Sequence, residues 1–157
     1  GRERLLIMPA ARTMTESWSL TIAASYRDIR LAASRVAAAA RAVGLNETAA
    51  HHCQLAVDEA CTNIIEHGYG GENVENSILI ACSSPSPGCL VIEITDSAPA
   101  FNPLTTDTQA DQKDTRSPPP GGWGVYFIKR LMDSVEYRYE HGQNHLLLKR
   151  CNAIDTS

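Results

Sequence analysis

The sequence predicts an α+β fold, a two-layer sandwich in which helices cover one face of a mixed, mostly antiparallel sheet. Segments with strand periodicity come mainly in pairs, and the segments between them have helical periodicity. At 157 residues and 43% hydrophobic, the chain suits one compact domain with one core. Paired strands with only helices between them favour an antiparallel or mixed sheet that is covered on one side.

The first predicted elements are one strand and two helices. Residues 18–23 alternate bulky apolar with small or polar side chains, which predicts a strand. Apolar residues then recur at helical spacing over 26–43, and Gly44 supplies a stop. Asn46 can cap a second helix, which runs to about His67 and ends in a glycine-rich turn.

A hairpin and a long loop follow. Residues 76–82 and 89–95 have strand character and flank a serine- and proline-rich loop, so they predict an antiparallel hairpin. Regular periodicity disappears over 96–122, where prolines and polar residues gather. A structureless loop of this length inside a compact domain is typical of an active-site lid.

The last predicted elements are a helix and a closing hairpin. Helical spacing resumes over 124–132, and residues 134–139 and 145–149 alternate as strands around His141-Gly142-Gln143-Asn144. The predicted division of the chain is a flexible terminus or cloning remnant, one folded domain and a tail, at residues 1–13, 14–151 and 152–157.

Charge and hydropathy bear on the classes of partner. The 14 basic and 18 acidic residues are spread along the chain and give a net charge of -4, without the basic stripe that tracks a phosphate backbone. The apolar run at 5–8 is stopped by Pro9 and is far shorter than a signal-peptide core or a membrane span. We therefore expect a soluble, cytoplasmic protein with no nucleic-acid or membrane partner.

The five cysteines are odd in number and contain no Cys-x-x-Cys pair, which argues against a disulfide framework and a zinc knuckle. They are Cys53, Cys61, Cys82, Cys89 and Cys151, and we expect them to be reduced thiols. The sequence His51-His52-Cys53 is not expected to bind a metal, because adjacent helical residues point in different directions.

Glu59 and Asn63 lie one helical turn apart on the polar face of the second predicted helix. Asparagine is disfavoured inside helices because its amide competes for backbone hydrogen bonds, so Asn63 suggests a side chain that serves something outside the helix. Its carbonyl oxygen can bind a hard cation such as Mg²⁺, and Glu59 can accept a proton beside that cation. The alternative is an ordinary solvated polar face.

Two further features are weaker signals when taken alone. Asp96 directly follows a predicted strand, where its carboxylate can accept the exocyclic amine of adenine or make local turn hydrogen bonds. Gly121-Gly122-Trp123-Gly124 opens a predicted helix, where backbone N–H groups can hold a phosphate or the glycines can serve turn geometry only.

In their order and spacing, these features resemble the GHKL or Bergerat ATP-binding fold. Within that superfamily the chain is most similar to the anti-sigma-factor serine kinases of bacterial partner-switching systems, the RsbW type. The resemblance covers residues 15–150, and the runs at 63–69 and 122–133 are specific to this branch.

The resemblance implies a role for each matching residue and implies ATP and Mg²⁺ as cofactors. Glu59 would be the general base that deprotonates or orients the acceptor hydroxyl, and Asn63 the magnesium ligand. Asp96 would receive the adenine amine, and the backbone of Gly122 and Gly124 would hold the phosphates.

Other positions depart from the family or match it less directly. Ala98 stands where glycine is common, which places a methyl group where the backbone passes close to the purine. Residues 142–145 stand where related ATPases carry a glycine-threonine pair, so no nucleotide contact is transferred to them. Lys113 and Arg116 lie in the predicted lid, from which they can reach the γ-phosphate.

The function implied is an ATP-dependent serine/threonine kinase that acts as an anti-sigma factor and phosphorylates an anti-sigma-factor antagonist of the STAS type. The resemblance also implies a homodimer and, as a further partner, a sigma factor. The alternative is a catalytically silent ATP-binding module that only sequesters a protein partner. P-loop enzymes and eukaryotic-type kinases are excluded because their signature motifs are absent from the sequence.

Overall fold

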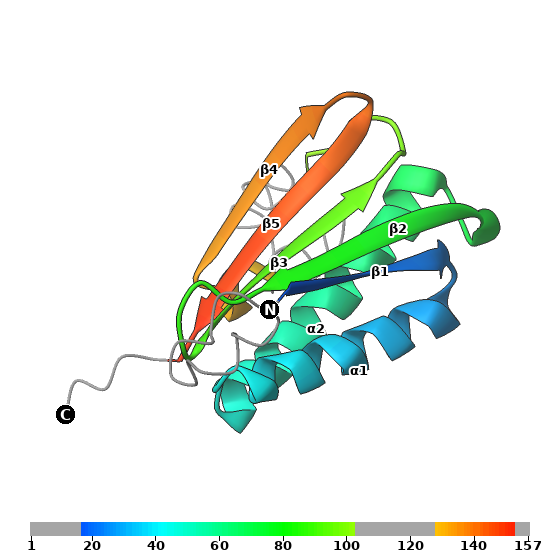
Figure 1. The fold of residues 1–157 in the computed structure, drawn as a ribbon. Helices are drawn as coiled ribbons and strands as arrows, with labels where there is room; N and C mark the ends of the chain where they lie inside the picture. Colours follow the sequence, from blue (N-terminus) through cyan, green and yellow to red (C-terminus); the bar gives the residue numbers. More distant parts are fainter. Residues whose placement is uncertain (1–16, 103–127, 153–157) are drawn as a thin grey trace, which may run out of the picture.

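The computed structural model describes residues 17–102 and 128–152, which form five strands, two α-helices and one π-helix (Figure 1). In chain order these are β1 (Ser17–Ala24), α1 (Tyr26–Ala42), α2 (Glu47–Asn63), η3 (Ile64–Tyr69), β2 (Asn73–Ser83), β3 (Cys89–Asp96), β4 (Ser134–Glu140) and β5 (Gln143–Cys151). Residues 128–131 are also helical.

The strands form one sheet in the order β1-β2-β3-β5-β4, and every neighbouring pair is antiparallel. Both α-helices lie against one face of this sheet (Figure 1). The α+β sandwich is thus confirmed. The strands β3 and β5 are neighbours although the 128–131 helix and β4 separate them in the chain, so the end of β3 meets the beginning of β5.

The core lies between the sheet and the helices. Alternate residues of the strands point into it, as the period of two requires. The largest fully buried side chains come from the helices and from β2, β3 and β5: Ile29, Val36, Cys53, Val57, Ile65, Ile78, Ile80, Leu90, Ile92, Ile94 and Leu148.

Both α-helices begin at a side-chain cap, of which Asn46 was predicted and Ser25 was not. The Ser25 hydroxyl accepts a hydrogen bond from the Asp28 N–H at 3.2 Å, and the Asn46 side chain accepts one from the Ala49 N–H at 2.8 Å. These oxygens satisfy N–H groups that have no partner inside a first helical turn. Gly44, with φ of 101°, ends the first helix as predicted.

The second helix differs from the prediction at its C-terminal end. The α-helix ends at Asn63, and residues 64–69 continue as a π-helix that stops at Gly70, whose φ is 79°. A π-helix has i→i+5 hydrogen bonds, is rare, and is frequently found at functional sites. Periodicity alone did not show this change.

The expectation of five free thiols is wrong. Cys89 and Cys151 form a disulfide, whereas Cys53, Cys61 and Cys82 are buried free cysteines. The two bonded residues are directly opposite in the register of β3 and β5. Sequence spacing cannot show this pair, because only the pairing of these two strands brings together residues 62 positions apart.

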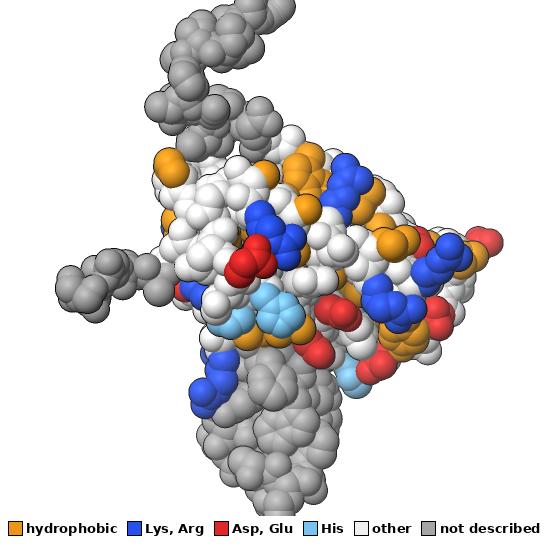
Figure 2. All heavy atoms as spheres, turned by 90° about the horizontal axis from the view of Figure 1, so that it is seen from below, with side chains coloured by type: hydrophobic (Ala, Val, Ile, Leu, Met, Phe, Trp, Pro, Cys, Tyr) orange, Lys and Arg blue, Asp and Glu red, His pale blue; other side chains and the backbone are white. Residues whose placement is uncertain are grey.

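No helix among the described residues has both the length and the apolar character needed to cross a lipid bilayer. Seen from below, the side on which α1 lies, side chains of both charge signs are interspersed on the surface (Figure 2).

Candidate functional site

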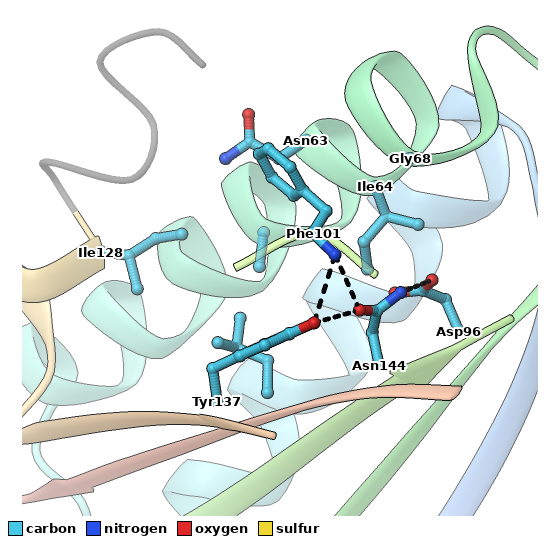
Figure 3. A pocket seen from close by; sticks show the side chains of 10 residues that line it. Asn63, Ile64, Gly68, Asp96, Phe101, Ile128, Tyr137 and Asn144 are labelled. Atoms are coloured by element: carbon cyan, nitrogen blue, oxygen red, sulfur yellow. Dashed lines mark hydrogen bonds between the residues drawn. The ribbon is translucent and has the colours of Figure 1, made fainter. Parts of the chain in front are cut away.

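A pocket opens between α2, η3 and the sheet, at the end where β3 stops and β5 begins (Figure 3). Its lining comes from seven segments of the chain. The lining residues are Ala60, Asn63, Ile64, Gly68, Asp96, Phe101, Ile128, Tyr137, Asn144 and Leu146. Most are apolar, and the polar groups that enter are few, as in a typical small-molecule site.

Two of the predicted site residues meet in this pocket. Asn63 comes from the last turn of α2 and Asp96 from the end of β3, and both are buried. Figure 3 shows Asn63 beside Phe101, on the opposite side of the pocket from Asp96. The sequence predicts that Asn63 lies on a polar helix face, and the structure shows that its side chain is buried there.

The amide of Asn63 is incompletely satisfied. Its Nδ2 atom is buried and has no hydrogen-bond partner among the described residues. A buried polar group without a partner costs free energy, roughly 1–3 kcal/mol, unless something else supplies the bond. The buried Nδ2 donor of Asn63 is therefore suited to a bound polar ligand.

Asp96 is held at one of its two carboxylate oxygens. Oδ1 accepts hydrogen bonds from the Ala98 N–H and from Nδ2 of Asn144, both at 2.9 Å. Burial raises the pKa of Asp96 above its ordinary value, while these two hydrogen bonds and the nearby His145 oppose that rise. Among the described residues, the hydrogen bonds to this carboxylate go to Oδ1, which leaves Oδ2 to accept from a ligand.

Glu59 lies one turn before Asn63 on α2, and it does not line the pocket itself. It is partly exposed. Burial of its carboxyl group raises its pKa, and the negative charges of Asp58 and Glu66 raise it further. A carboxylate whose pKa is raised above its ordinary value is a stronger proton acceptor.

Ala98 is buried below the pocket rather than exposed in it, and its methyl group faces η3. A β-carbon built on Gly68 would lie 3.1 Å from the Ala98 Cβ atom. The extra methyl group at position 98 therefore occupies space that a side chain at Gly68 would need.

The remaining predicted site residues, Gly122, Gly124, Lys113 and Arg116, lie outside the described residues. Within the described ranges, no group of three or more His, Cys, Asp and Glu side chains is arranged to hold a metal ion.

Sequence reasoning missed Asn144, which contacts more of the site than any predicted residue. It was assigned to a turn, but the turn is only His141-Gly142, whose φ angles of 55° and 76° fit a two-residue hairpin. Asn144 lies inside β5, directly opposite Asp96. An asparagine in phase with the core-facing Leu146 and Leu148 is the signal that could have found it.

Tyr69 was also missed, although it connects three segments around the site. Its hydroxyl donates to the Ser77 carbonyl at 2.7 Å and accepts from the Ser97 N–H at 2.9 Å. The π-helix is thereby fixed to β2 and to the residue that follows Asp96.

Comparison with a model of the histidine kinase-like ATPase domain gives a match over residues 22–150, which includes every described element except the first part of β1 and the end of β5. The chain belongs to the histidine kinase-like ATPase family. The residues that line the pocket between α2 and the end of β3 all lie within the matched range.

Two curated relatives of this ATPase domain carry the name serine-protein kinase RsbW. The one from Bacillus mycoides (strain KBAB4) is 30% identical over 100 residues, and the one from Bacillus cereus (strain AH187) is 28% identical over 100 residues. In both cases the match covers 61% of this chain and 61% of the relative.

A solved structure shares the fold of this ATPase domain. The crystal structure of the RsbU and RsbW domains of Rv1364c from Mycobacterium tuberculosis matches with a TM-score of 0.60 and 14% sequence identity. The match covers 89% of this chain and 35% of that one. At this identity the likeness concerns the fold alone.

Proposed function

We propose that this chain is an ATP-dependent serine/threonine protein kinase that acts as an anti-sigma factor in a partner-switching system. The observation that carries the proposal is that Asn63 and Asp96, which come from separate elements, line one pocket with Glu59 a turn away on the same helix. The similarity to proteins named serine-protein kinase RsbW supports this choice among the activities of kinase-like ATPases.

Asp96 binds the adenine base in this proposal. Its Oδ2 atom accepts a hydrogen bond from the 6-amino group, while Oδ1 stays bound to Ala98 and Asn144. An ionised carboxylate is a strong acceptor inside an apolar pocket. The backbone of Gly122 and Gly124 holds the phosphates, and Lys113 and Arg116 contact the γ-phosphate.

Asn63 is the proposed ligand of Mg²⁺, and its unsatisfied amide fits that role, because rotation by 180° presents Oδ1 where Nδ2 now lies. No acidic cluster among the described residues could hold the ion alone. The nucleotide phosphates would therefore supply further Mg²⁺ ligands, as they commonly do. When bound, Mg²⁺ neutralises charge on the transferred phosphoryl group.

Glu59 is the proposed general base. Its raised pKa suits proton transfer from the acceptor hydroxyl near neutral pH, and its partial exposure leaves it accessible to an incoming protein. Phosphoryl transfer depends mainly on positioning and charge neutralisation, so one well-placed carboxylate is sufficient as the base.

The proposed acceptor is a serine of a small anti-sigma-factor antagonist of the STAS type, and the proposed competing partner is a sigma factor. Regulation of transcription would follow from the exchange between these two complexes. We further propose that the protein works as a homodimer in the cytoplasm.

The test is a transfer assay with Mg²⁺, labelled ATP and candidate antagonist domains from the same genome. We expect the wild type to label one of them, and Glu59→Gln to bind ATP as the wild type does while transferring roughly 100-fold to 10,000-fold more slowly. The matched control is Glu47→Gln, which removes the same charge from the exposed start of the same helix.

Asn63→Ala is expected to lose the Mg²⁺-dependent part of nucleotide binding, measured by calorimetry with and without the ion. Equal transfer by Glu59→Gln and wild type would rule out the base assignment. ATP binding by the wild type with no transfer to any antagonist would favour the silent, sequestering module instead.

A further inference from the structure

Asn144 makes five hydrogen bonds within the protein, all from one buried side chain. Figure 3 shows those to Asp96, Phe101 and Tyr137. Its Nδ2 donates to Asp96 Oδ1 at 2.9 Å, to the Ala98 carbonyl at 3.0 Å and to the Pro99 carbonyl at 3.1 Å. Its Oδ1 accepts from the Phe101 N–H at 3.1 Å and from the Tyr137 hydroxyl. An amide has two N–H groups and two lone pairs, so no capacity remains for a ligand.

The orientation of this amide is determined by its partners. The Phe101 N–H can only donate, so it requires Oδ1 at that end, whereas the carbonyls of Ala98 and Pro99 require the NH₂ group at the other. Asn144 therefore presents a donor to Asp96 and cannot present an acceptor.

The first effect of Asn144 is on the carboxylate of Asp96. The N–H at Oδ1 stabilises the negative charge in a buried place, and it turns Oδ2 away from the protein partners. Other titratable groups facing Asp96 are His145 on β5, which favours the charged form, and Tyr69 on η3, Tyr137 on β4 and Cys61 on α2, each of whose own pKa Asp96 raises.

The second effect is on the backbone from 98 to 101. Three groups of this segment bind the Asn144 amide, and the Phe101 N–H also donates to the Tyr137 hydroxyl at 3.2 Å. The Phe101 ring stacks on the His67 ring of η3, with centroids 6.1 Å apart. The Asn144 side chain thus fixes the position of the Asp96 carboxylate relative to the backbone of residues 98–101.

We propose that Asn144 is a positioning residue that makes Asp96 and the 98–101 backbone one rigid base-binding unit, which selects a 6-aminopurine over a 6-oxopurine without touching the base. This inference rests on the proposed function, because it assigns the selection to the same pocket. A carboxylate held with Oδ2 toward the base accepts from a 6-amino group and repels a 6-oxo group. If the carboxyl group can rotate or take up a proton, it can also donate to a 6-oxo group, and the preference for the 6-amino group is lost.

The test compares Asn144→Ala with wild type in calorimetric titrations of Mg-ATP and Mg-GTP from pH 5 to pH 8. We expect ATP affinity to fall roughly 10-fold to 100-fold, in line with loss of a hydrogen bond to a charged group, and GTP affinity to fall less. We also expect the loss of ATP binding toward acid pH to begin at higher pH in the variant.

Asn152→Ala is the matched control. The Asn152 amide also binds backbone groups at both of its ends, since Nδ2 donates to the Gly44 carbonyl at 2.9 Å and Oδ1 accepts from the Asn46 N–H at 2.8 Å, both in the link between α1 and α2. It lies just beyond the other end of β5, roughly 26 Å along the strand from Asn144. Its loss should lower the melting temperature and leave the ATP-to-GTP ratio and the pH profile unchanged.

Tyr137→Phe gives a second test if Asn144→Ala does not fold. This variant removes one partner of Asn144 Oδ1 and keeps the aromatic ring, so we expect a smaller fall of the ATP-to-GTP ratio in the same direction. An unchanged ratio and an unchanged pH profile in the folded variants would overturn the inference.

Failure of the proposed function is distinguishable from failure of this inference. Wild-type protein that binds no adenine nucleotide would contradict the former. The latter is still decided without nucleotide by carbon-13 NMR titration of the Asp96 carboxyl, whose pKa should be higher in Asn144→Ala than in wild type. An identical pKa in both proteins would refute the positioning role.

Discussion

The methyl group of Ala98 faces Gly68 so closely that a β-carbon on Gly68 would lie 3.1 Å from it. Gly68 lies in the π-helix η3, and Ala98 lies in the turn that follows Asp96. Hydrogen bonds of the Tyr69 hydroxyl hold η3, and one from Asn144 to the Ala98 carbonyl holds the turn. Neither segment can therefore move easily to relieve a clash. Gly68 and Ala98 therefore pack directly against each other, with no room for a second methyl group.

Gly68→Ala should therefore destabilise the protein, and Ala98→Gly should rescue it. Overpacking costs typically about 1–3 kcal/mol, which exceeds the gain of roughly 1 kcal/mol from replacing a helical glycine. Urea unfolding of the two single variants and the double variant measures the coupling. We expect the double variant to be more stable than additivity predicts by about 1–3 kcal/mol. Strict additivity would show that the two positions do not compete for space.

Asp96→Asn should reverse the base preference of the pocket. The Ala98 N–H and Asn144 Nδ2 both donate to the Oδ1 position, so the new amide must place its oxygen there and its NH₂ group toward the base. Calorimetry should show ATP affinity lower by roughly 10-fold to 100-fold and GTP affinity raised relative to it. Equal losses for both nucleotides would mean that position 96 does not contact the 6-substituent.

The same variant should be more stable than wild type at neutral pH. Because burial raises the folded-state pKa of Asp96, the folded protein binds a proton there more tightly than the unfolded chain does. The resulting penalty is fully present above the folded pKa and disappears as pH falls below the unfolded value. The melting-temperature advantage of Asp96→Asn should accordingly be largest near pH 7 and shrink toward acid pH.

Local patterns were sufficient to predict most elements. Alternation and helical spacing predicted five strands and three helices, of which the third is described over residues 128–131. The caps Ser25, Asn46 and Gly44 obey the rules that make them recognisable in sequence. Ser25 was not predicted as a cap, although a serine three residues before an acidic residue such as Asp28 is a common signal for the start of a helix. Such features depend on neighbours within one turn or strand.

What the sequence did not show depends on pairing between distant strands. The disulfide and the Asp96–Asn144 contact both follow from the register of β3 with β5, at opposite ends of the same pair. The π-helix depends on packing of η3 against β2 and the turn after Asp96, through Tyr69. Local patterns had singled out Asn63 and Asp96, and family resemblance assigned their roles. It gave no role to Asn144, because this residue departs from the family pattern.

The Cys89–Cys151 bond should stabilise the fold without affecting nucleotide binding. It closes a loop of 62 residues, for which lost chain entropy in the unfolded state amounts to about 4 kcal/mol. Dithiothreitol should lower the urea midpoint of the wild type and leave that of the Cys89→Ser/Cys151→Ser double variant unchanged. Reducing conditions such as those of the cytosol favour the dithiol. Because the bond lies at the opposite end of the β3–β5 pair from Asp96 and Asn144, ATP affinity should be equal with and without reductant.

Thiol counting checks the same bond. Unfolded, unreduced protein should show the three thiols of Cys53, Cys61 and Cys82, with the other two appearing only after reduction. Five reactive thiols before reduction would show that the bond does not form.

The pH dependence of phosphoryl transfer should report on Glu59 and respond to its neighbour Asp58. Burial raises the pKa of Glu59 most, and the charges of Asp58 and Glu66 raise it further. A general base must be ionised, so the transfer rate should fall as pH is lowered through this raised pKa. Asp58→Asn removes a negative charge next to Glu59, which lowers the pKa of Glu59 and moves the acid limb of the rate profile to lower pH.

The size of the shift of the acid limb, compared among variants, shows whether Glu59 is the general base. Glu66→Gln should move the acid limb in the same direction by less, since Glu66 raises the pKa of Glu59 less than Asp58 does. Glu47→Gln should not move it, because its exposed carboxylate lies about 18 Å along the helix and is screened by salt. The rates at the alkaline plateau should agree within roughly twofold, as expected when only the protonation of the base changes. An acid limb that stays in place in Asp58→Asn would show that a group other than Glu59 accepts the proton.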